Sequence, residues 1–575
     1  MHPLLRIENL TVEFGSEAGT IKAAKKVSFS AGRGEILAIV GESGSGKTVT
    51  ALSILQLLPS PPANYQTGKI LFSADGLQPE DLLKKSRDEL KEIRGNKIAM
   101  IFQEPMTSLN PVFTCGKQVM EAILVHKKIS TVQARTETIE WFTRAQLPDP
   151  EKIFARYPHQ LSGGQKQRVM IAMAMSCHPS LLICDEPTTA LDVSVQKTIL
   201  DLIRQLQKEH GIGVIFITHD LGLVAEIADR VVAMYKGEIV EQNYVGEIFD
   251  RPQHPYTKAL LACRPANHRK GERLPVVSDF MENDQSPSDQ TGLNARKEPA
   301  WVLRQNEKKG VLLSVRNLST WFAAKKNFLG TSVEFTRAVD DVSFDVYQGE
   351  TLGLVGESGC GKTTLGRTLL RLIEPTGGKV IYRGQDLLEK SKRELKSMRG
   401  EIQIIFQDPY SSLNPRLTIG AALAEPVRVH HLFSERPQIK QRAIELLEKV
   451  GLRSEHFRRY PHEFSGGQRQ RIVIARALAV SPAFIVCDEP VSALDVSVQA
   501  QVLNLLNDLK QEFNFTVIFI SHDLSVVRYI SDRIIVMNKG KIEESGTADD
   551  IYYHPKTEYT KKLISSIPGI HPVGK

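Results

Sequence analysis

Short, continuous apolar runs alternate with segments of helical periodicity along most of the chain. Gly34–Val40 (GEILAIV) is such a run, followed by a glycine-rich turn and then by KTVTALSILQLL, whose apolar positions repeat with the period of a helix. Leu181–Glu186 and Gly213–Asp220 are runs typical of strands that are buried on both faces of a parallel sheet. The pattern predicts an α/β fold.

Two further patterns add elements to this picture. Arg230–Gln242 has two β-type runs around Lys236-Gly237 and predicts a hairpin. Residues 120–147 and 423–452 have helical character.

The chain is an internal repeat. Gly41–Thr48 (GESGSGKT) returns as Gly356–Thr363 (GESGCGKT), and CDEPTTALDVSVQ returns as CDEPVSALDVSVQ. Lys47 and Lys362 are 315 positions apart, whereas Gln103 and Gln407 are 304 apart. The first half therefore carries about eleven extra residues around positions 59–85, which indicates a duplication with a local insertion.

The repeat and a polar stretch between its copies predict the domain organisation. Residues 263–310 are rich in Pro, Ser, Asn and Asp, which is typical of a solvated linker. We expect one domain over residues 1–262, a polar linker over 263–310 and a second domain over 311–575.

Composition narrows the possible classes of protein. The 575 residues are too many for one compact unit, and 41% hydrophobic residues exclude global disorder. A formal charge of +7 with 24% charged residues is ordinary for a globular protein and gives no support for nucleic-acid binding. The apolar runs fall short of the ~18 residues that span a bilayer, and the start lacks a signal-peptide pattern. We expect a soluble or peripheral protein.

The six cysteines are scattered, with no CxxC pair and no histidine cluster beside them. This spacing predicts a reducing compartment and neither a zinc site nor an iron–sulfur cluster.

A glycine-rich turn between a predicted strand and a predicted helix occurs in both halves, and this is the context of a phosphate-binding loop. Its backbone N–H groups can approach a polyphosphate, its lysine can neutralise the β- and γ-phosphates, and its threonine hydroxyl suits Mg²⁺. The residues predicted to bind nucleotide in these loops are Gly41, Glu42, Ser43, Gly44, Ser45, Gly46, Lys47 and Thr48, and Gly356, Glu357, Ser358, Gly359, Cys360, Gly361, Lys362 and Thr363.

Acidic residues and a histidine end two of the predicted strands. Asp185 can hold Mg²⁺ through its water shell, and a carboxylate at Glu186 can polarise an attacking water. His219 ends a buried strand and is a candidate for contact with the γ-phosphate. The second half repeats these three residues as Asp488, Glu489 and His522.

Each half also contains an SGGQ motif that is predicted to start a helix, where it can donate hydrogen bonds to an anion. Each half already has a phosphate-binding loop, so we expect each SGGQ to serve the nucleotide of the other half. The residues concerned are Ser162, Gly163, Gly164 and Gln165, and Ser465, Gly466, Gly467 and Gln468.

In this order the motifs resemble those of an ABC ATPase: Walker A, a Q-loop glutamine (Gln103 and Gln407), LSGGQ, Walker B with its glutamate, a D-loop (Asp192 and Asp495) and a switch histidine. More narrowly, FQEPMTSLNP, FQDPYSSLNP, YPHQLSGGQ, ALDVSVQ and HPYTKALL resemble the oligopeptide/dipeptide/nickel importer ATPases. The resemblance covers nearly all of the chain outside the linker.

The resemblance implies two tandem P-loop NTPase domains of ABC type, each α/β with an antiparallel β subdomain and a helical subdomain, paired as an intramolecular pseudo-dimer. It implies ATP and Mg²⁺ as ligands, with two nucleotides each held between one half's Walker motifs and the other half's SGGQ. Phe14 and Phe322 match the adenine-stacking aromatic, with packing in a strand core as the alternative. The residues expected around Mg²⁺ are Thr48, Asp185 and Gln103, and Thr363, Asp488 and Gln407.

The resemblance also implies partners and a location. We expect two transmembrane permease subunits, a solute-binding protein, no nucleic acid, and a peripheral position on the cytoplasmic face of a bacterial plasma membrane. Peptides are the expected substrate, with nickel and glutathione as alternatives. A soluble ABC protein acting on ribosomes or DNA is a further alternative, which is disfavoured because Leu221 and Leu524 follow the His-Asp pairs where ribosomal relatives have arginine.

Overall fold

The computed structural model describes residues 3–16, 19–74, 76–103, 108–189, 191–281, 310–326, 332–492 and 494–567. They form two compact units. Unit 1 comprises the described residues up to Ala262 together with helix α12, and unit 2 comprises Cys263–Val276 together with the described residues from 310 to 567. The predicted linker is thus divided, and its residues 282–309 lie outside the described residues.

Unit 1 contains the elements of the first repeat. Its strands are β1 (Leu5–Ser16), β2 (Gly19–Ala31), β3 (Ile36–Val40), β4 (Ala63–Phe72), β5 (Glu80–Asp81), β6 (Ile98–Ile101), β7 (Leu181–Asp185), β8 (Gly213–Thr218), β9 (Arg230–Tyr235) and β10 (Glu238–Tyr244). Its helices are α1 (Lys47–Ile54), α2 (Arg87–Ile93), α4 (Cys115–His126), α5 (Thr131–Arg144), α6 (Pro150–Ala155), α7 (Gly163–Met175), α8 (Val193–His210), α9 (Leu221–Ile227), α10 (Val245–Asp250), α11 (Pro255–Ala262) and α12 (Val277–Met281).

Unit 2 repeats this order. Its strands are β11 (Val311–Lys326), β12 (Ser332–Tyr347), β13 (Thr351–Val355), β14 (Gly377–Tyr382), β15 (Gln385–Asp386), β16 (Ile402–Ile405), β17 (Phe484–Asp488), β18 (Thr516–Ser521), β19 (Arg533–Asn538) and β20 (Lys541–Thr547). Its helices are α13 (Lys362–Leu369), α14 (Lys392–Met398), α15 (Pro409–Ser412), α16 (Ile419–Val429), α17 (Arg436–Lys449), α18 (Gly466–Leu478), α19 (Val496–Phe513), α20 (Leu524–Ile530), α21 (Ala548–Tyr553) and α22 (Glu558–Ser565).

A six-stranded sheet forms the centre of each unit. In unit 1 its order is β10-β9-β3-β8-β7-β6, and only the β9–β10 pair is antiparallel among these neighbours. The continuous apolar runs predicted as buried strands are β3, β7 and β8, in which every residue is buried. Unit 2 has the equivalent order β16-β17-β18-β13-β19-β20.

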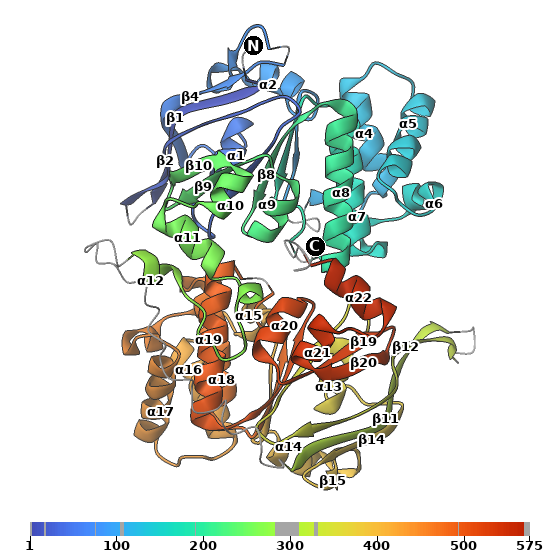
Figure 1. The fold of residues 1–575 in the computed structure, drawn as a ribbon, viewed down its shortest axis with the longest axis vertical. Helices are drawn as coiled ribbons and strands as arrows, with labels where there is room; N and C mark the ends of the chain where they lie inside the picture. Colours follow the sequence, from blue (N-terminus) through green and yellow to red (C-terminus); the bar gives the residue numbers. More distant parts are fainter. Residues whose placement is uncertain are drawn as a thin grey trace. The chain divides into compact units, whose positions relative to one another are not determined.

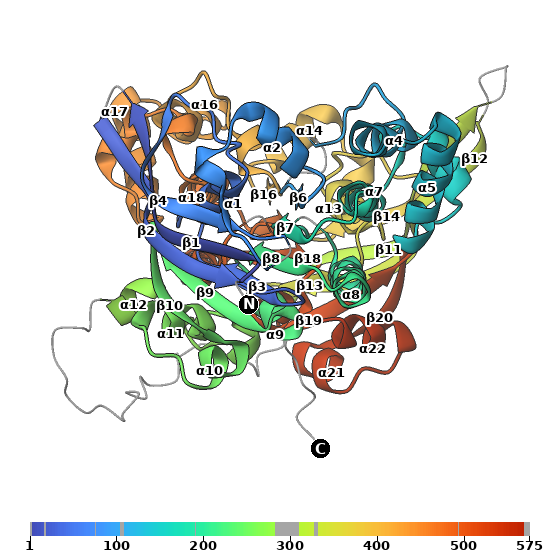
Figure 2. The same ribbon diagram turned by 90° about the horizontal axis from the view of Figure 1, so that it is seen from above.

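In unit 1, two hydrophobic cores lie on the two faces of the central sheet. Along β8, Val214 and Phe216 belong to one core and Ile215 and Ile217 to the other, as the two-residue period of a strand requires. An antiparallel sheet, β2-β1-β4-β5, covers one face, and α7 packs on the other, where it shares a core with α4, α5 and α8 (Figures 1 and 2). The predicted α/β class with an antiparallel β part and a helical part is confirmed.

Two details of the sequence pattern resolve differently. Each of the two stretches predicted to be helical contains two helices: α4 and α5 in unit 1, and α16 and α17 in unit 2. In unit 1 the second helix starts at a new N-cap, Ser130, which forms a capping box with Gln133. Part of the extra length of the first half is in β4, which has 10 residues where β14 has 6, and part is in the connection to β5, which starts at Glu80 after β4 ends at Phe72, whereas β15 starts at Gln385 after β14 ends at Tyr382.

No helix in the described ranges combines the length and the apolar composition that crossing a bilayer requires.

Residues 263–276, here called the strap, pack on α19 and α20 of unit 2. The backbone N–H of Leu274 donates to Asn504 Oδ1 at 3.0 Å, and its carbonyl accepts from Asn504 Nδ2 at 2.8 Å. Tyr529 Oη donates to the carbonyl of Glu272 at 2.7 Å. A buried peptide group needs such partners, so these bonds explain why this part of the predicted linker is ordered.

Ion pairs add to the strap's attachment. Lys270 pairs with Asp532, which lies between α20 and β19, and Arg273 Nη1 lies 2.9 Å from Asp508 Oδ2. The unit 1 residues at the repeat positions of Asn504 and Tyr529 have different chemistry: they are Asp201 and Glu226. The surface that receives the strap is therefore specific to unit 2.

Replacing Asn504 by alanine should release the strap. Loss of both bonds leaves the backbone groups of Leu274 without partners, at a cost of about 1–3 kcal/mol, so we expect tryptic cleavage within 263–276 to accelerate roughly five- to a hundredfold. The measurement is limited proteolysis followed by mass spectrometry. Asp201→Ala, at the equivalent position of unit 1, is the matched control; equal cleavage rates in the two variants would contradict the attachment.

Candidate active site

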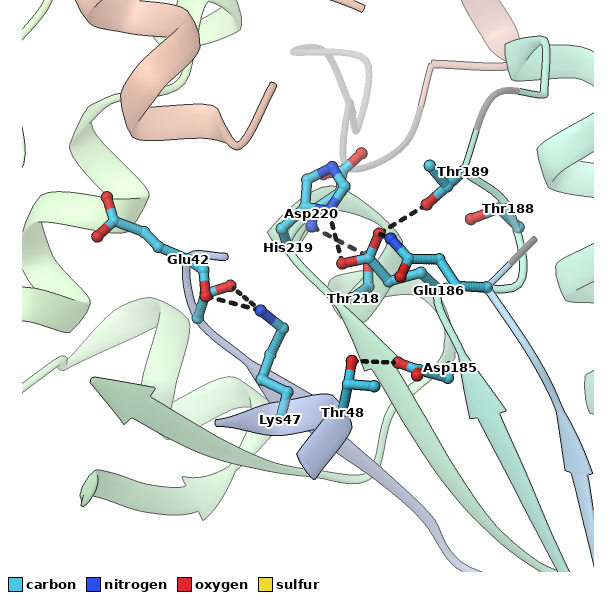
Figure 3. A network of polar contacts seen from close by, with 12 residues as sticks. Glu42, Lys47, Thr48, Asp185, Glu186, Thr188, Thr189, Thr218, His219 and Asp220 are labelled. Carbon is cyan, nitrogen blue, oxygen red and sulfur yellow. Dashed lines mark hydrogen bonds and ion pairs between the residues drawn. The ribbon is translucent and has the colours of Figure 1, made fainter. Parts of the chain in front are cut away.

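The phosphate-binding loop of unit 1 connects the end of β3 to the start of α1. Gly46 has φ +96°, and a Cβ there would lie 2.4 Å from the carbonyl oxygen of Ala23, so only glycine fits. Lys47 Nζ donates to the carbonyls of Gly41 and Glu42 at 2.7 and 2.8 Å (Figure 3). The loop therefore curls around the ammonium group of its own lysine.

The N-terminus of α1 is suited to an anion. Within the described residues no side-chain hydrogen bond caps this helix, and a helix N-terminus attracts negative charge. The hydroxyl of Ser45 is buried and has no hydrogen-bond partner among the described residues. Unit 2 has Cys360 at this position, with its Sγ 3.9 Å from Lys362 Nζ. A polyphosphate would satisfy the donors of both loops.

The aspartate that ends β7 faces the loop's threonine. Thr48 Oγ1 donates to Asp185 Oδ1 at 3.1 Å, and in unit 2 Thr363 Oγ1 donates to Asp488 Oδ1 at 2.8 Å. Burial raises the pKa of Asp185 to about 6, against the lowering effect of Thr48. Burial also raises the pKa of Asp488. Each aspartate needs a cation or a donor to be stable as an anion.

The glutamate after each strand has an unusual backbone. Glu186 has φ +47° and Glu489 has φ +48°, in the left-handed region that costs a residue with a side chain about 1–3 kcal/mol. A hydrogen bond from the backbone N–H of Glu186 to the carbonyl of Ile217, 3.0 Å long, holds this conformation. In this conformation the carboxylate of Glu186 lies near His219, which follows the end of β8.

Three side chains contact the Glu186 carboxylate, and Figure 3 labels two of them, Thr189 and His219. Gln103 Nε2 donates to Oε2 at 3.1 Å, and Thr189 Oγ1 donates to the same atom at 2.9 Å. His219 Nδ1 lies 3.2 Å from Oε1. Burial raises the pKa of Glu186, but the hydrogen bond and charge of His219, with Thr189 and Lys47, outweigh it and lower the pKa to about 2. This glutamate is ionised at neutral pH.

Unit 2 repeats the network. Gln407 Nε2 donates to Glu489 Oε2 at 2.9 Å, and His522 Nδ1 lies 3.3 Å from Glu489 Oε1. Burial raises the pKa of Glu489, but His522 and Lys362 lower it overall. Ser492, at the repeat position of Thr189, donates to the backbone carbonyl of Glu489 at 3.1 Å. The predicted Walker, Q-loop and switch residues therefore converge in both units.

The SGGQ motifs start α7 and α18. Ser162 Oγ accepts from the backbone N–H of Gln165 at 3.3 Å, and Gln165 Oε1 accepts from the backbone N–H of Ser162 at 3.1 Å. Ser465 and Gln468 form the same capping box. Both serines keep their hydroxyl hydrogen for a further acceptor. The predicted pairing of each motif with the nucleotide of the other half stays a prediction.

The two candidate adenine-stacking residues differ in exposure. Phe14 on β1 is partly buried and packs against the apolar core of unit 1. Phe322 on β11 is 44% exposed. Core packing, the alternative interpretation, thus describes part of the Phe14 surface, and adenine stacking stays a prediction for both residues.

Sequence reasoning missed a tyrosine that contacts each phosphate-binding loop. The backbone N–H of Glu42 donates to Tyr256 Oη at 2.8 Å, and that of Glu357 donates to Tyr559 Oη at 3.2 Å. The repeated pair Tyr-Thr at 256–257 and 559–560 was the available signal. Through these bonds the carboxyl-terminal helices of each unit help to shape its loop.

Two family models match parts of both halves of the chain. Residues 24–189 and 339–492 match the family model described as ABC transporter. Residues 240–287 and 544–575 match the model described as the C-terminal region of oligopeptide/dipeptide transporters. Both regions that contain the contacting tyrosines lie within these matches.

Curated relatives cover nearly the whole chain. Proteins named glutathione import ATP-binding protein GsiA from Shigella dysenteriae serotype 1 and Escherichia coli K12 are each 49% identical over 574 residues, which is 99% of this chain and 90% of theirs. Among solved structures, the post-hydrolysis dimer of the ATP-binding cassette MJ0796 with ADP and Pi is 29% identical, with a TM-score of 0.37, covering 41% of this chain and 98% of that chain.

Hydrolysis of ATP should depend on both glutamates. Glu186→Gln combined with Glu489→Gln replaces two carboxylates with amides that cannot accept a proton, so we expect turnover to fall by roughly 10²–10⁴ while ATP binding persists. Phosphate release and equilibrium binding of a fluorescent ATP analogue measure the two effects. Asp88→Asn, an exposed carboxylate on α2, is the control; near-normal turnover in the double variant would remove the glutamates from the reaction.

Proposed function

Because the chain belongs to the ABC transporter family and is an ATPase that energises transport, we propose that it drives the import of peptides or a related small solute, with glutathione as the first candidate. The observation that supports it is the complete set of Walker, Q-loop and switch residues in both units, each glutamate ionised and hydrogen-bonded. An ABC-type binding module without turnover would not need two intact glutamates.

Within each site the residues have distinct tasks. The lysine and the N-terminus of the loop helix bind the β- and γ-phosphates. The glutamate accepts the proton of an attacking water, which the Q-loop amide and the histidine orient toward the γ-phosphate. ATP hydrolysis then leaves ADP and phosphate. In unit 1 these tasks fall to Lys47, Glu186, Gln103 and His219, and in unit 2 to Lys362, Glu489, Gln407 and His522.

The residues present fit a divalent cation beside the phosphates. Asp488 Oδ2 is buried and finds no hydrogen-bond partner in the ranges that the structure describes, while Oδ1 already faces the Thr363 hydroxyl. One carboxylate and one hydroxyl beside a polyphosphate are the ligands that Mg²⁺ uses in such sites. Thr363 and Asp488, and Thr48 and Asp185, would hold it, and it would neutralise part of the charge on the phosphates.

We further propose that each SGGQ completes the opposite site. The first turns of α7 and α18 contain no acidic residue, and Ser162 and Ser465 can still donate their hydroxyl hydrogens. An ATP bound at one unit's loop would then bridge to the other unit's helix and draw the two together. Loss of the γ-phosphate after hydrolysis would weaken this bridge, which gives a cycle that separate permease subunits can use.

The substrate is proposed from the relatives. Proteins 49% identical along nearly the full chain are named for glutathione import, and the matched C-terminal region is named for oligopeptide/dipeptide transporters. Glutathione is itself a tripeptide, so the two names describe one chemical class. Nickel is the remaining alternative among small solutes. The C-terminal match to a transporter region also disfavours an action on ribosomes or DNA.

Uptake of labelled glutathione tests the function. We expect cells with this chain, two permease subunits and a solute-binding protein at the cytoplasmic membrane to take it up, and cells with the Glu186→Gln/Glu489→Gln chain not to. Competition by unlabelled dipeptide or by nickel would reassign the substrate. Co-sedimentation of the chain with ribosomes, without any uptake, would overturn the importer proposal.

A single arginine should test the composite sites. Ser465→Arg places a fixed positive charge and bulk at the start of α18, so we expect trapping of nucleotide by vanadate to fail at the site of Lys47. Ser162→Arg should instead affect the site of Lys362. Photolabelling with an azido-ATP analogue, followed by proteolysis in the 282–309 segment, assigns the trapped nucleotide to a half. Loss confined to the mutated half would mean that each unit works alone.

A further inference from the structure

The loop helix of unit 2 has a charged residue that unit 1 lacks. Arg367 lies on α13 five residues after Lys362 and four after Thr363, so it shares a helix face with that threonine. The equivalent position of α1, five residues after Lys47, is Leu52, which packs against the apolar core. The duplication thus provides a built-in comparison between a cationic and an apolar side chain at one position.

Arg367 lies beside the carboxylate that ends β17. Its Nη2 is 3.8 Å from Asp488 Oδ2, which is too long for a hydrogen bond but close enough for a strong attraction between charges. Asp488 is almost fully buried, and its other oxygen accepts from Thr363. One face of α13 therefore lies next to both carboxylate oxygens of Asp488: the Thr363 hydroxyl donates to Oδ1, and the Arg367 guanidinium lies near Oδ2.

The guanidinium also lies near the Q-loop. Its carbon lies 5.9 Å from the ring centroid of Phe406, which directly precedes Gln407. Gln407 in turn donates to Glu489. Arg367 is 41% exposed, and its Nε finds no hydrogen-bond partner within the described part of the chain. The guanidinium is therefore attracted to Asp488 and to the ring of Phe406, but its Nε forms no hydrogen bond with either of them.

We propose that Arg367 is a positioning residue that competes with a divalent cation for Asp488, so that the second ATP site needs more of that cation than the first. The inference rests on the proposed role of Asp488 in holding Mg²⁺. Two cations cannot both approach one buried carboxylate oxygen without repulsion, and a partly exposed guanidinium at this distance should weaken cation binding roughly three- to tenfold. The first site, with Leu52, has no such competitor at this position.

Mn²⁺ binding followed by electron paramagnetic resonance tests this without hydrolysis. The measurement uses the full chain with a non-hydrolysable ATP analogue and with Lys47→Ala, which leaves the second site. In this background Arg367→Leu should tighten Mn²⁺ binding roughly three- to tenfold, and Arg367→Lys, which keeps the charge, should change it much less. Metal-free binding of the analogue should be similar in all three chains, which checks that the site is folded.

The reciprocal variant is the matched control. With Lys362→Ala, which leaves the first site, Leu52→Arg should weaken Mn²⁺ binding by a similar factor. If Arg367→Leu leaves Mn²⁺ affinity unchanged or weakens it, while Asp488→Asn abolishes binding, the inference is wrong and the proposed metal site stands. If Mn²⁺ binds in neither background, the proposed function fails, and this inference fails with it.

Discussion

Both candidate sites depend on keeping two adjacent carboxylates charged at the end of a fully buried strand. Burial alone favours the protonated acids, so each carboxylate needs its own compensation. Asp185 accepts a hydrogen bond from the Thr48 hydroxyl on the loop helix. Glu186 contacts the amide of Gln103, the hydroxyl of Thr189 and the imidazole of His219, which come from three other segments. These partners can meet only where β3, β7 and β8 are neighbours and their carboxyl ends share an edge. The strand order of the central sheet is the arrangement that satisfies this electrostatic requirement.

Comparing the two units shows which features of the site are the same in both copies and which differ. The glutamate's left-handed backbone, its contacts with glutamine and histidine, and the tyrosine bond to the loop recur in both units. Other positions differ: Ser45 is replaced by Cys360, and Thr189 by Ser492. The carboxylates and their glutamine and histidine partners therefore recur in both units, whereas these two differences lie in the phosphate-binding loop and next to the glutamate.

Much of the fold and of the site could be predicted because the relevant signals are local. A glycine-rich turn, an acidic pair after an apolar run and an SGGQ at a helix start can each be recognised from a few consecutive residues. The positive φ of Glu186 could not be predicted, because a long-range bond to Ile217 holds it. Tyr256 and Leu274 also depend on partners more than 200 residues away. A polar composition alone made residues 263–276 resemble a solvated linker, although the backbone atoms of Glu272 and Leu274 form hydrogen bonds with side chains of unit 2.

The strap also sets an order of events during synthesis. Leu274 leaves the ribosome 230 residues before Asn504, and at about 5–20 residues per second this amounts to roughly ten to fifty seconds without its partner. A chain that stops before α19 retains this leucine, which is almost fully buried in the finished protein, as an exposed apolar group. Truncated chains thus display a surface that chaperones and proteases recognise, and complete chains conceal it.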